Sequence, residues 1–274
     1  MNSKHIQMKY KMLVVDMDDT LLTDTHEISI ENRDMLLKAQ ELGVYVVLAS
    51  GRPTSAMIDY AKALQCDINN SYMISFNGST ITDLKEDKVL FEHALTKDQI
   101  HSLYDFSQEN NTHIITYLNG QIISERHSEY IDIESTITGL ELVIVPNFKE
   151  AVTTSAVKCL LLEEPSYLKN IEPVLKVAMP ELSVCMSKPF FLEAAPNGVH
   201  KGAAIEILAQ KLNIDPSEII AVGNAGNDLT MVQYAGLGVW VANVEPELRA
   251  FGDVIVASNN NHGVAEVVRR FILN

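Results

Sequence analysis

The chain has 274 residues, of which 47% are hydrophobic and 21% are charged, so it is long enough for one large or two ordinary globular domains. This length and composition exclude a small disulfide-stapled module and a mainly disordered chain. The 21 Lys and Arg residues stand against 36 Asp and Glu, a net charge of −15. Because this charge would repel a phosphate backbone, we expect no nucleic-acid partner.

The lengths of the apolar segments and the spacing of the cysteines bear on the cellular location of the protein. The run Met12–Val15 ends at Asp16, which makes it too short for the apolar region of a signal peptide, and no run reaches the roughly 18 apolar residues that span a bilayer. Cys66, Cys159 and Cys185 form no CxxC pair and no zinc spacing, so we expect core thiols in a reducing compartment. The sequence therefore predicts a cytoplasmic protein with no membrane partner.

Short runs rich in Val, Ile and Leu alternate with helical patterns near both ends of the chain. These runs lack polar alternation, which is typical of strands buried on both faces of a parallel sheet. Ser29 can cap a helix that Gly43 ends, and apolar spacing predicts helices through Met57–Leu64 and Ala204–Leu212. The expected strands are residues 12–15, 44–49, 219–222, 237–241 and 253–257. The pattern predicts an α/β fold with a doubly wound, Rossmann-like parallel-sheet core.

The middle of the chain has a different pattern. Thr96 and Gln99 form a capping-box signature before a helix, and Asn119-Gly120 is typical of a hairpin turn. The α/β alternation resumes at residues 190–192. We therefore predict an inserted α+β cap domain at residues 89–188, within a core formed by residues 1–88 and 189–274.

Polar side chains follow the predicted strands, and ligands of an open α/β sheet bind beyond the carboxyl ends of its strands. The strand-end segments are Asp16–Thr20, Ser50–Pro53, Phe76–Gly78 and Gly223–Asp228. Asp16 and Asp18 point at one small volume, which two carboxylates do not favour unless a cation shares it. Mg²⁺ suits oxygen ligands of this kind. The sequence therefore predicts a metal-assisted site on this edge of the sheet.

The same edge has features that suit an anion. The helix after Ser50 directs backbone amides and a positive dipole end toward it, and Lys201 can supply the compact positive charge that a phosphoryl group requires. Each feature alone has an ordinary structural explanation: a turn at Ser50-Gly51, a solvated helix start at Lys201, or helix capping by Asn227 and Asp228. Their order at successive strand ends favours the functional interpretation.

The string DMDDTLL, then SGR, then a lysine after the middle block, and then GNAGND followed by LTM resembles the haloacid-dehalogenase-like phosphohydrolases. The large middle block and the ending NNNHGVAEVV resemble the Cof-like branch, which carries an α+β (type IIB) cap. The motifs cover both ends of the chain, whereas the middle block matches mainly in position and length. The resemblance implies a cap that closes over the core and selects the substrate.

The resemblance also implies roles for the strand-end residues. Asp16 would be the nucleophile that forms an aspartyl-phosphate, and Asp18 would be the general acid and base. The residues implied to hold phosphoryl oxygens are Ser50, Gly51, Lys201 and Asn227. The implied cofactor is Mg²⁺, with ligands drawn from Asp16, Asp18, Asn224 and Asp228.

Two positions depart from the family pattern. Asp19 stands where glycine is common, and we expect the turn to survive because Asp tolerates a positive φ. Asn224 stands where the family usually has an aspartate that binds Mg²⁺. An amide oxygen can coordinate but brings no charge, so we expect a raised magnesium requirement unless Asp228 compensates.

The expected function is Mg²⁺-dependent hydrolysis of small phosphorylated metabolites such as sugar phosphates, nucleotides or phosphorylated cofactors. Arg52 and Asn77 are candidate substrate contacts, and so is Arg126 in the middle block. For both arginines, a position on the surface without such a contact is the commoner alternative. Two alternatives stay open: a sugar phosphomutase, and a metabolite-binding protein without turnover, which Asn224 favours. We expect a monomer or a homodimer.

Overall fold

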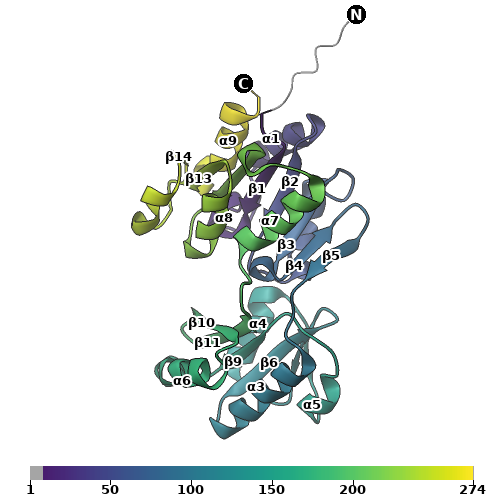
Figure 1. The fold of residues 1–274 in the computed structure, drawn as a ribbon, viewed down its shortest axis with the longest axis vertical. Helices are drawn as coiled ribbons and strands as arrows, with labels where there is room; N and C mark the ends of the chain where they lie inside the picture. Colours follow the sequence, from purple (N-terminus) through teal and green to yellow (C-terminus); the bar gives the residue numbers. More distant parts are fainter. Residues whose placement is uncertain (1–8, 274) are drawn as a thin grey trace, which may run out of the picture. The chain divides into compact units, whose positions relative to one another are not determined.

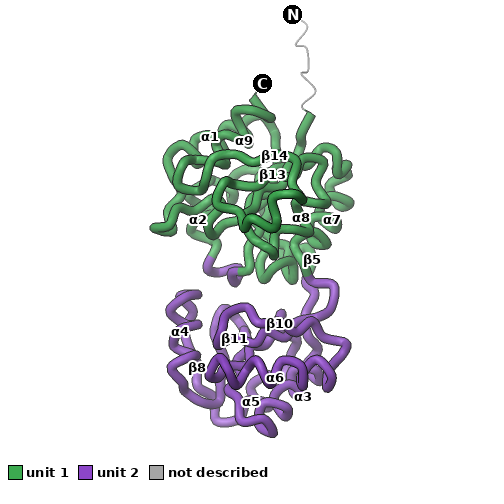
Figure 2. The backbone as a smooth tube through the Cα atoms, turned by 90° about the vertical axis from the view of Figure 1, so that its left-hand side faces the viewer, with its two compact units in different colours: residues 1–51, 57–91, 200–274 green, residues 52–56, 92–199 purple. Residues whose placement is uncertain are grey.

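The structure is a computed structural model that describes residues 9–273. It divides into two compact units (Figure 2). We call the unit formed by the chain up to residue 51, residues 57–91 and the chain from residue 200 the core unit, and the unit formed by residues 52–56 and 92–199 the cap unit.

The unit boundaries differ from the predicted domain boundaries. Residues 189–199 were expected in the core but lie in the cap unit, because Phe191–Pro196 pairs antiparallel with two strands of the cap sheet. Residues 89–91 were expected in the cap but lie in the core unit, because Lys88–Glu92 is the last strand of the core sheet. These two shifts arise from strand pairing between distant segments. Residues 52–56, which were also expected in the core, group with the cap unit as well.

The core unit contains an eight-stranded sheet with the order β14-β13-β12-β1-β2-β3-β4-β5. The strands from β14 to β3 are parallel, and β4 runs antiparallel to β3. The strands are β1 (Met12–Asp16), β2 (Tyr45–Ala49), β3 (Tyr72–Ser75), β4 (Thr80–Asp83), β5 (Lys88–Glu92), β12 (Ile219–Gly223), β13 (Leu237–Val241) and β14 (Val254–Val256). The predicted α/β class with a parallel-sheet core is confirmed.

Helices cover both faces of this sheet (Figure 1). Leu13 and Val15 of β1 belong to a buried cluster with α1, α2 and α9, whereas Met12 and Val14 belong to a cluster with α7 and α8. The helices are α1 (Ile30–Glu41), α2 (Ile58–Ala63), α7 (Lys201–Leu212), α8 (Leu229–Tyr234) and α9 (Gly263–Phe271). Alternate residues of one strand are thus buried on opposite faces, which explains the absence of polar alternation.

The cap unit is built on a six-stranded sheet with the order β10-β11-β9-β6-β7-β8, in which only the pair β7–β8 is parallel among the described pairs. Helices α3, α5 and α6 contribute to its apolar core. The elements are α3 (Lys97–Glu109), β6 (His113–Leu118), β7 (Gln121–Ser124), α4 (Glu129–Thr138), β8 (Leu142–Ile144), α5 (Phe148–Ala151), β9 (Cys159–Leu162), α6 (Pro165–Ala178), β10 (Leu182–Lys188) and β11 (Phe191–Pro196). The middle block therefore has the predicted α+β structure.

The helix caps and the hairpin turn that the sequence predicts are present in the structure. Ser29 Oγ accepts from the Asn32 N–H at 3.2 Å at the start of α1. At the start of α3, Thr96 N–H donates to Gln99 Oε1 at 2.9 Å and Gln99 N–H donates to Thr96 Oγ1 at 3.2 Å. Asn119-Gly120 connects β6 and β7. These caps and turns depend on neighbouring residues, which is why the sequence predicts them.

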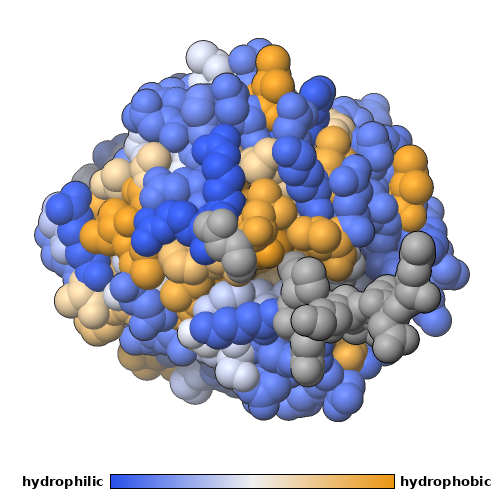
Figure 3. Space-filling view, turned by 90° about the horizontal axis from the view of Figure 1, so that it is seen from above, coloured by the Kyte–Doolittle hydropathy of each residue, from blue (hydrophilic) through white to orange (hydrophobic). Residues whose placement is uncertain are grey.

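The surface adds three observations. Within residues 9–273, no helix combines the length and the apolar character needed to cross a membrane. Cys66 and Cys159 are buried, but Cys185 on β10 is exposed, so the expectation of a core position is wrong for that thiol. On the face shown in Figure 3, hydrophilic side chains predominate and hydrophobic side chains form patches between them.

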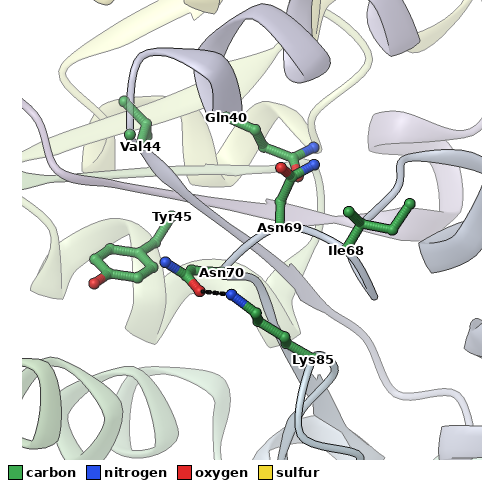
Figure 4. A pocket seen from close by; sticks show the side chains of 8 residues that line it. Gln40, Val44, Tyr45, Ile68, Asn69, Asn70 and Lys85 are labelled. Carbon is green, nitrogen blue, oxygen red and sulfur yellow. Dashed lines mark hydrogen bonds between the residues drawn. The ribbon is translucent and has the colours of Figure 1, made fainter.

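A cavity of about 200 Å³ lies at the amino end of β2 (Figure 4). Its lining includes Gln40, Tyr45, Asn70 and Lys85, and Lys85 Nζ donates to Asn70 Oδ1 at 3.1 Å. Tyr45 begins β2, whereas the predicted site residues follow its last residue. This cavity is therefore separate from the strand-end residues.

Candidate active site

The candidate site lies at the carboxyl ends of β12, β1, β2 and β3, which are neighbours in that order. Asp16 is the last residue of β1, Ser50 follows β2, Asn77 lies two residues after β3, and Asn224 follows β12. Lys201 is the first residue of α7. Parallel pairing places these segments on one edge of the sheet, as the strand-end rule predicts.

A buried lysine joins two of the predicted carboxylates. Lys201 Nζ lies 2.5 Å from Asp16 Oδ1 and 2.6 Å from Asp228 Oδ1. Lys201 and Asp228 are 0% exposed and Asp16 is 5% exposed, so the group is almost completely removed from water. Two carboxylates can be buried here because each has the ammonium as a charge-assisted donor.

Burial and the ion pairs oppose each other at this group. Burial raises the pKa of Asp16, the neighbouring Asp228 raises it further, and Lys201 acts in the opposite direction without cancelling the rise. Burial alone would lower the pKa of Lys201, but Asp16 and Asp228 outweigh it and hold that pKa above its ordinary value. Lys201 is therefore a fixed positive charge, and added positive charge near Asp16 favours its carboxylate form.

Oxygens from three segments converge on the side chain of Asn224. With its amide nitrogen turned inward, Asn224 donates to Asp16 Oδ2 at 3.3 Å, Asp18 O at 3.2 Å and Thr20 Oγ1 at 3.0 Å. With its oxygen turned inward, it accepts from the Thr20 hydroxyl at 3.0 Å. In that second orientation, a carboxylate, a backbone carbonyl and an amide oxygen face one another, which is a ligand set that suits Mg²⁺. These residues therefore fit the implied metal.

Asp228 has a different environment from the one expected of a metal ligand. Its Oδ1 accepts from Lys201, and its Oδ2 accepts from the N–H groups of Asn224 at 2.9 Å and Ala225 at 3.1 Å. These partners are all donors, so Asp228 shapes the loop after β12 and holds Lys201. In the described residues, no cluster of three or more His, Cys, Asp or Glu side chains is arranged to hold a metal ion.

The turn after β1 contains one site residue that sequence reasoning assigned and one that it missed. The Asp18 side chain is 42% exposed, with Oδ1 at 3.8 Å from His26 Nδ1. Asp19 adopts a φ of +57°, so the expectation that this turn survives without glycine is confirmed. Thr20 had no predicted role, yet its hydroxyl bonds Asn224; its place four residues after Asp16 in the same strand-end string was the available signal.

The predicted phosphate-binding residues lie on the β2 and β12 sides of the edge. Ser50 is 1% exposed, and its N–H donates to Ile74 O at 2.9 Å. Asn227 Nδ2 donates to Asn77 Oδ1 at 3.1 Å. The helical segment after Ser50 begins as a short 3₁₀ turn at Thr54–Met57, followed by α2.

The two arginines considered as substrate contacts both group with the cap unit. Arg52 begins the segment 52–56, immediately after Gly51 in the chain. Arg126 is exposed and its Nη2 donates to Gln108 Oε1 at 3.1 Å. The contact of Arg52 with substrate stays a prediction.

Comparisons with known proteins identify the family. A family model described as haloacid dehalogenase-like hydrolase matches residues 13–268. YxeH of Bacillus subtilis is 34% identical over 267 residues, covering 96% of this chain and 99% of YxeH. The 5-amino-6-(5-phospho-D-ribitylamino)uracil phosphatase YcsE of Bacillus subtilis is 28% identical over 263 residues, covering 96% of each chain.

A solved structure gives the same result in three dimensions. The crystal structure of a haloacid dehalogenase-like hydrolase from Bacteroides thetaiotaomicron has a TM-score of 0.91 and 31% identity, and the match covers 96% of this chain and 99% of that one. Sequence and fold thus agree over nearly the whole length of both proteins. The chain belongs to the haloacid dehalogenase-like hydrolases.

Proposed function

We propose that this hydrolase is a phosphatase that removes the phosphoryl group from small phosphorylated metabolites through an aspartyl-phosphate on Asp16. The observation that carries the proposal is the buried Lys201 ammonium held against Asp16, on the same edge of the sheet as the loops after β2 and β12. The relatives YcsE and YwpJ of Bacillus subtilis, which are phosphatases by name, support it.

In the first step, the Asp16 carboxylate attacks phosphorus, and the bond from phosphorus to the leaving-group oxygen breaks. Asp18 gives its proton to that oxygen. The position of Asp18 supports this role, because its side chain is 42% exposed whereas Asp16 is buried. An exposed carboxyl can exchange protons with solvent between turnovers.

In the second step, water attacks the phosphorus of the aspartyl-phosphate while Asp18 takes a proton from that water. The bond between phosphorus and the Asp16 oxygen breaks, which releases phosphate and restores the Asp16 carboxylate. The groups that hold the phosphoryl oxygens are Ser50, Gly51, Lys201 and Asn227. Lys201 supplies the full positive charge of this set, and its ammonium is already oriented by two carboxylates.

Mg²⁺ would be held by the Asp16 carboxylate, the Asp18 carbonyl and the Asn224 amide oxygen. When bound, it offsets the repulsion between the Asp16 carboxylate and the phosphoryl oxygens. Asn224 adds no charge to this set, and both oxygens of Asp228 already accept from other donors. Asp228 therefore does not replace the missing charge, and the magnesium requirement is raised.

The test is release of inorganic phosphate from p-nitrophenyl phosphate, with Mg²⁺ or with a chelator. We expect release only with the metal, and a loss of roughly 10³-fold or more in Asp16→Asn, since the nucleophile is removed. Asp34→Asn on α1 is the control, because Asp34 is an exposed carboxylate paired with Arg33. Turnover in Asp16→Asn that equals the control would overturn the mechanism.

Asn224 favours a second candidate function, a protein that binds phosphorylated metabolites without turning them over. In the orientation with nitrogen inward, its amide bonds the oxygens that a cation would otherwise satisfy. A screen of phosphorylated metabolites by calorimetry and by phosphate release separates the two functions. Binding without release on every compound would favour the second candidate.

A further inference from the structure

A run of left-handed backbone follows β3. Phe76, Asn77 and Gly78 have φ values of +50°, +55° and +110°. A positive φ costs a residue such as Phe about 1–2 kcal/mol, so this conformation persists only where the surroundings fix it. Strain of this kind is concentrated at functional sites. The contacts that residues 76–78 make therefore indicate which part of the site this conformation serves.

Asn77 touches two of the segments that carry the proposed phosphate ligands. Its N–H donates to Ser50 O at 2.9 Å, and its Oδ1 accepts from Asn227 Nδ2 at 3.1 Å. Its amide also packs against Gly51, where a Cβ would lie 3.1 Å from Asn77 Nδ2. One side chain thus bridges the loops after β2 and β12.

Gly78 touches a third segment, the start of α7. A Cβ on Gly78 would lie 2.6 Å from His200 O and 3.3 Å from Lys201 N. Only glycine allows this approach at a φ of +110°. Residues 76–78 therefore contact all three segments that carry the proposed phosphate ligands, although none of those ligands lies within residues 76–78.

We propose that Asn77 is a positioning residue, which orients the Asn227 amide and the Ser50-Gly51 loop toward the same phosphoryl oxygens. This inference rests on the proposed function, because it takes these three residues as phosphate ligands. An asparagine amide has two N–H donors. Asn77 accepts one donor of Asn227, which fixes the amide plane and directs the second donor to a phosphoryl oxygen.

The test is Asn77→Gly, which keeps the left-handed backbone and removes the bridging amide. We expect KM for p-nitrophenyl phosphate with Mg²⁺, and the Kd for inorganic phosphate by calorimetry, each to rise roughly tenfold. Asn213→Gly is the matched control, since Asn213 is an exposed asparagine of the core unit with a φ of +53°. We expect it to leave both constants unchanged.

A double-mutant cycle separates positioning from a direct contact with phosphate. If Asn77 acts through Asn227, adding Asn77→Gly to Asn227→Ala should weaken phosphate binding much less than Asn77→Gly does in the wild type. Fully multiplicative losses, or an unchanged phosphate Kd in Asn77→Gly, would overturn the inference.

Gly51→Ala gives a second test, made both in the wild type and in Asn77→Gly because Gly51 is itself a proposed phosphate ligand. The new methyl group would lie 3.1 Å from Asn77 Nδ2, so it should weaken phosphate binding in the wild type and much less once the Asn77 side chain is removed. Equal losses in the two backgrounds contradict the inference. The outcomes also distinguish the two proposals. Phosphate binding that depends on Asn77, without release from any ester, would refute the phosphatase function only. Release that is insensitive to Asn77 would refute the positioning role only.

Discussion

At the scale of single residues, the site depends on how one lysine and one asparagine meet the oxygens of β1. Lys201 binds one oxygen of Asp16, and Asn224 faces the other. The carboxylate is thus held between a permanent positive charge and a neutral amide. A charged ligand in place of the amide would attract a cation more strongly, because the site is shielded from water.

Asn224→Asp tests this difference in charge. We expect the Mg²⁺ concentration for half-maximal phosphate release to fall roughly tenfold, which corresponds to about 1.4 kcal/mol of metal binding. Titrating Mg²⁺ against initial rates measures the change. Asn213→Asp, which adds the same charge at an exposed position, should leave the requirement unchanged. An unaltered magnesium dependence in Asn224→Asp would show that the amide is not the cause of a raised requirement.

At the scale of elements, the turn after β3 and the start of α7 are packed too closely to accept a side chain between them. Gly78 lies against the carbonyl of His200, directly before Lys201. We expect a larger residue there to push the start of α7 away from the sheet edge, because an added Cβ would lie 2.6 Å from His200 O. The close packing of Gly78 against His200 therefore helps to fix the position of Lys201.

Gly78→Ala should destabilise the protein by about 3 kcal/mol or more, because it combines a clash with a positive φ. Gly43→Ala is the matched control, since Gly43 has a φ of +88° and nothing lies within 4 Å of its added Cβ. We expect the control to lose only about 1 kcal/mol from backbone strain. Urea unfolding of both variants measures the difference, and equal losses would show that the contact with His200 is unimportant.

A second element-scale prediction concerns α4 and β6 in the cap unit. Tyr117 Oη donates to Glu134 Oε1 at 2.5 Å, and both residues are buried. Burial raises the pKa of Glu134 above 4.5, although Tyr117 and Lys158 oppose the rise. The folded state therefore binds more protons than the unfolded state between pH 4.5 and the raised pKa. Within that interval, the contribution of Glu134 to stability falls as pH rises.

Glu134→Gln should remove this contribution. We expect the free energy of unfolding of the variant to decline less with rising pH across that interval than that of the wild type. Urea unfolding at a series of pH values measures both slopes. Identical slopes in the two proteins would show that Glu134 titrates as it does in the unfolded chain.

At the scale of the whole molecule, the two units have separate apolar cores. The cap core draws on residues from Leu95 to Ala194, and the core unit has one cluster on each face of its sheet. A unit with its own core and its own sheet has the features of an independent domain. The separate cores support the predicted division into two domains, which stays a prediction, as do the cytoplasmic location and the oligomeric state.

A chain of residues 92–199 alone should fold cooperatively, because its buried cluster lies entirely within those residues. We expect a single urea transition by circular dichroism, with near-ultraviolet signals from its aromatic side chains. A gradual, non-cooperative loss of signal would show that the cap needs the core unit for stability.

The order of motifs along the chain was sufficient to predict the hydrolase family, the fold class and the residues at the strand ends. These signals are local: a buried strand, a cap or a strand-end aspartate depends on a few neighbouring residues. Other features depend on contacts between distant segments, such as the pairing of β11 with the cap sheet and the hydrogen bond between Asn77 and Asn227, 150 residues apart. The ion pair between Asp228 and Lys201 also belongs to this second class, because the packing of α7 against the sheet brings the lysine to that carboxylate.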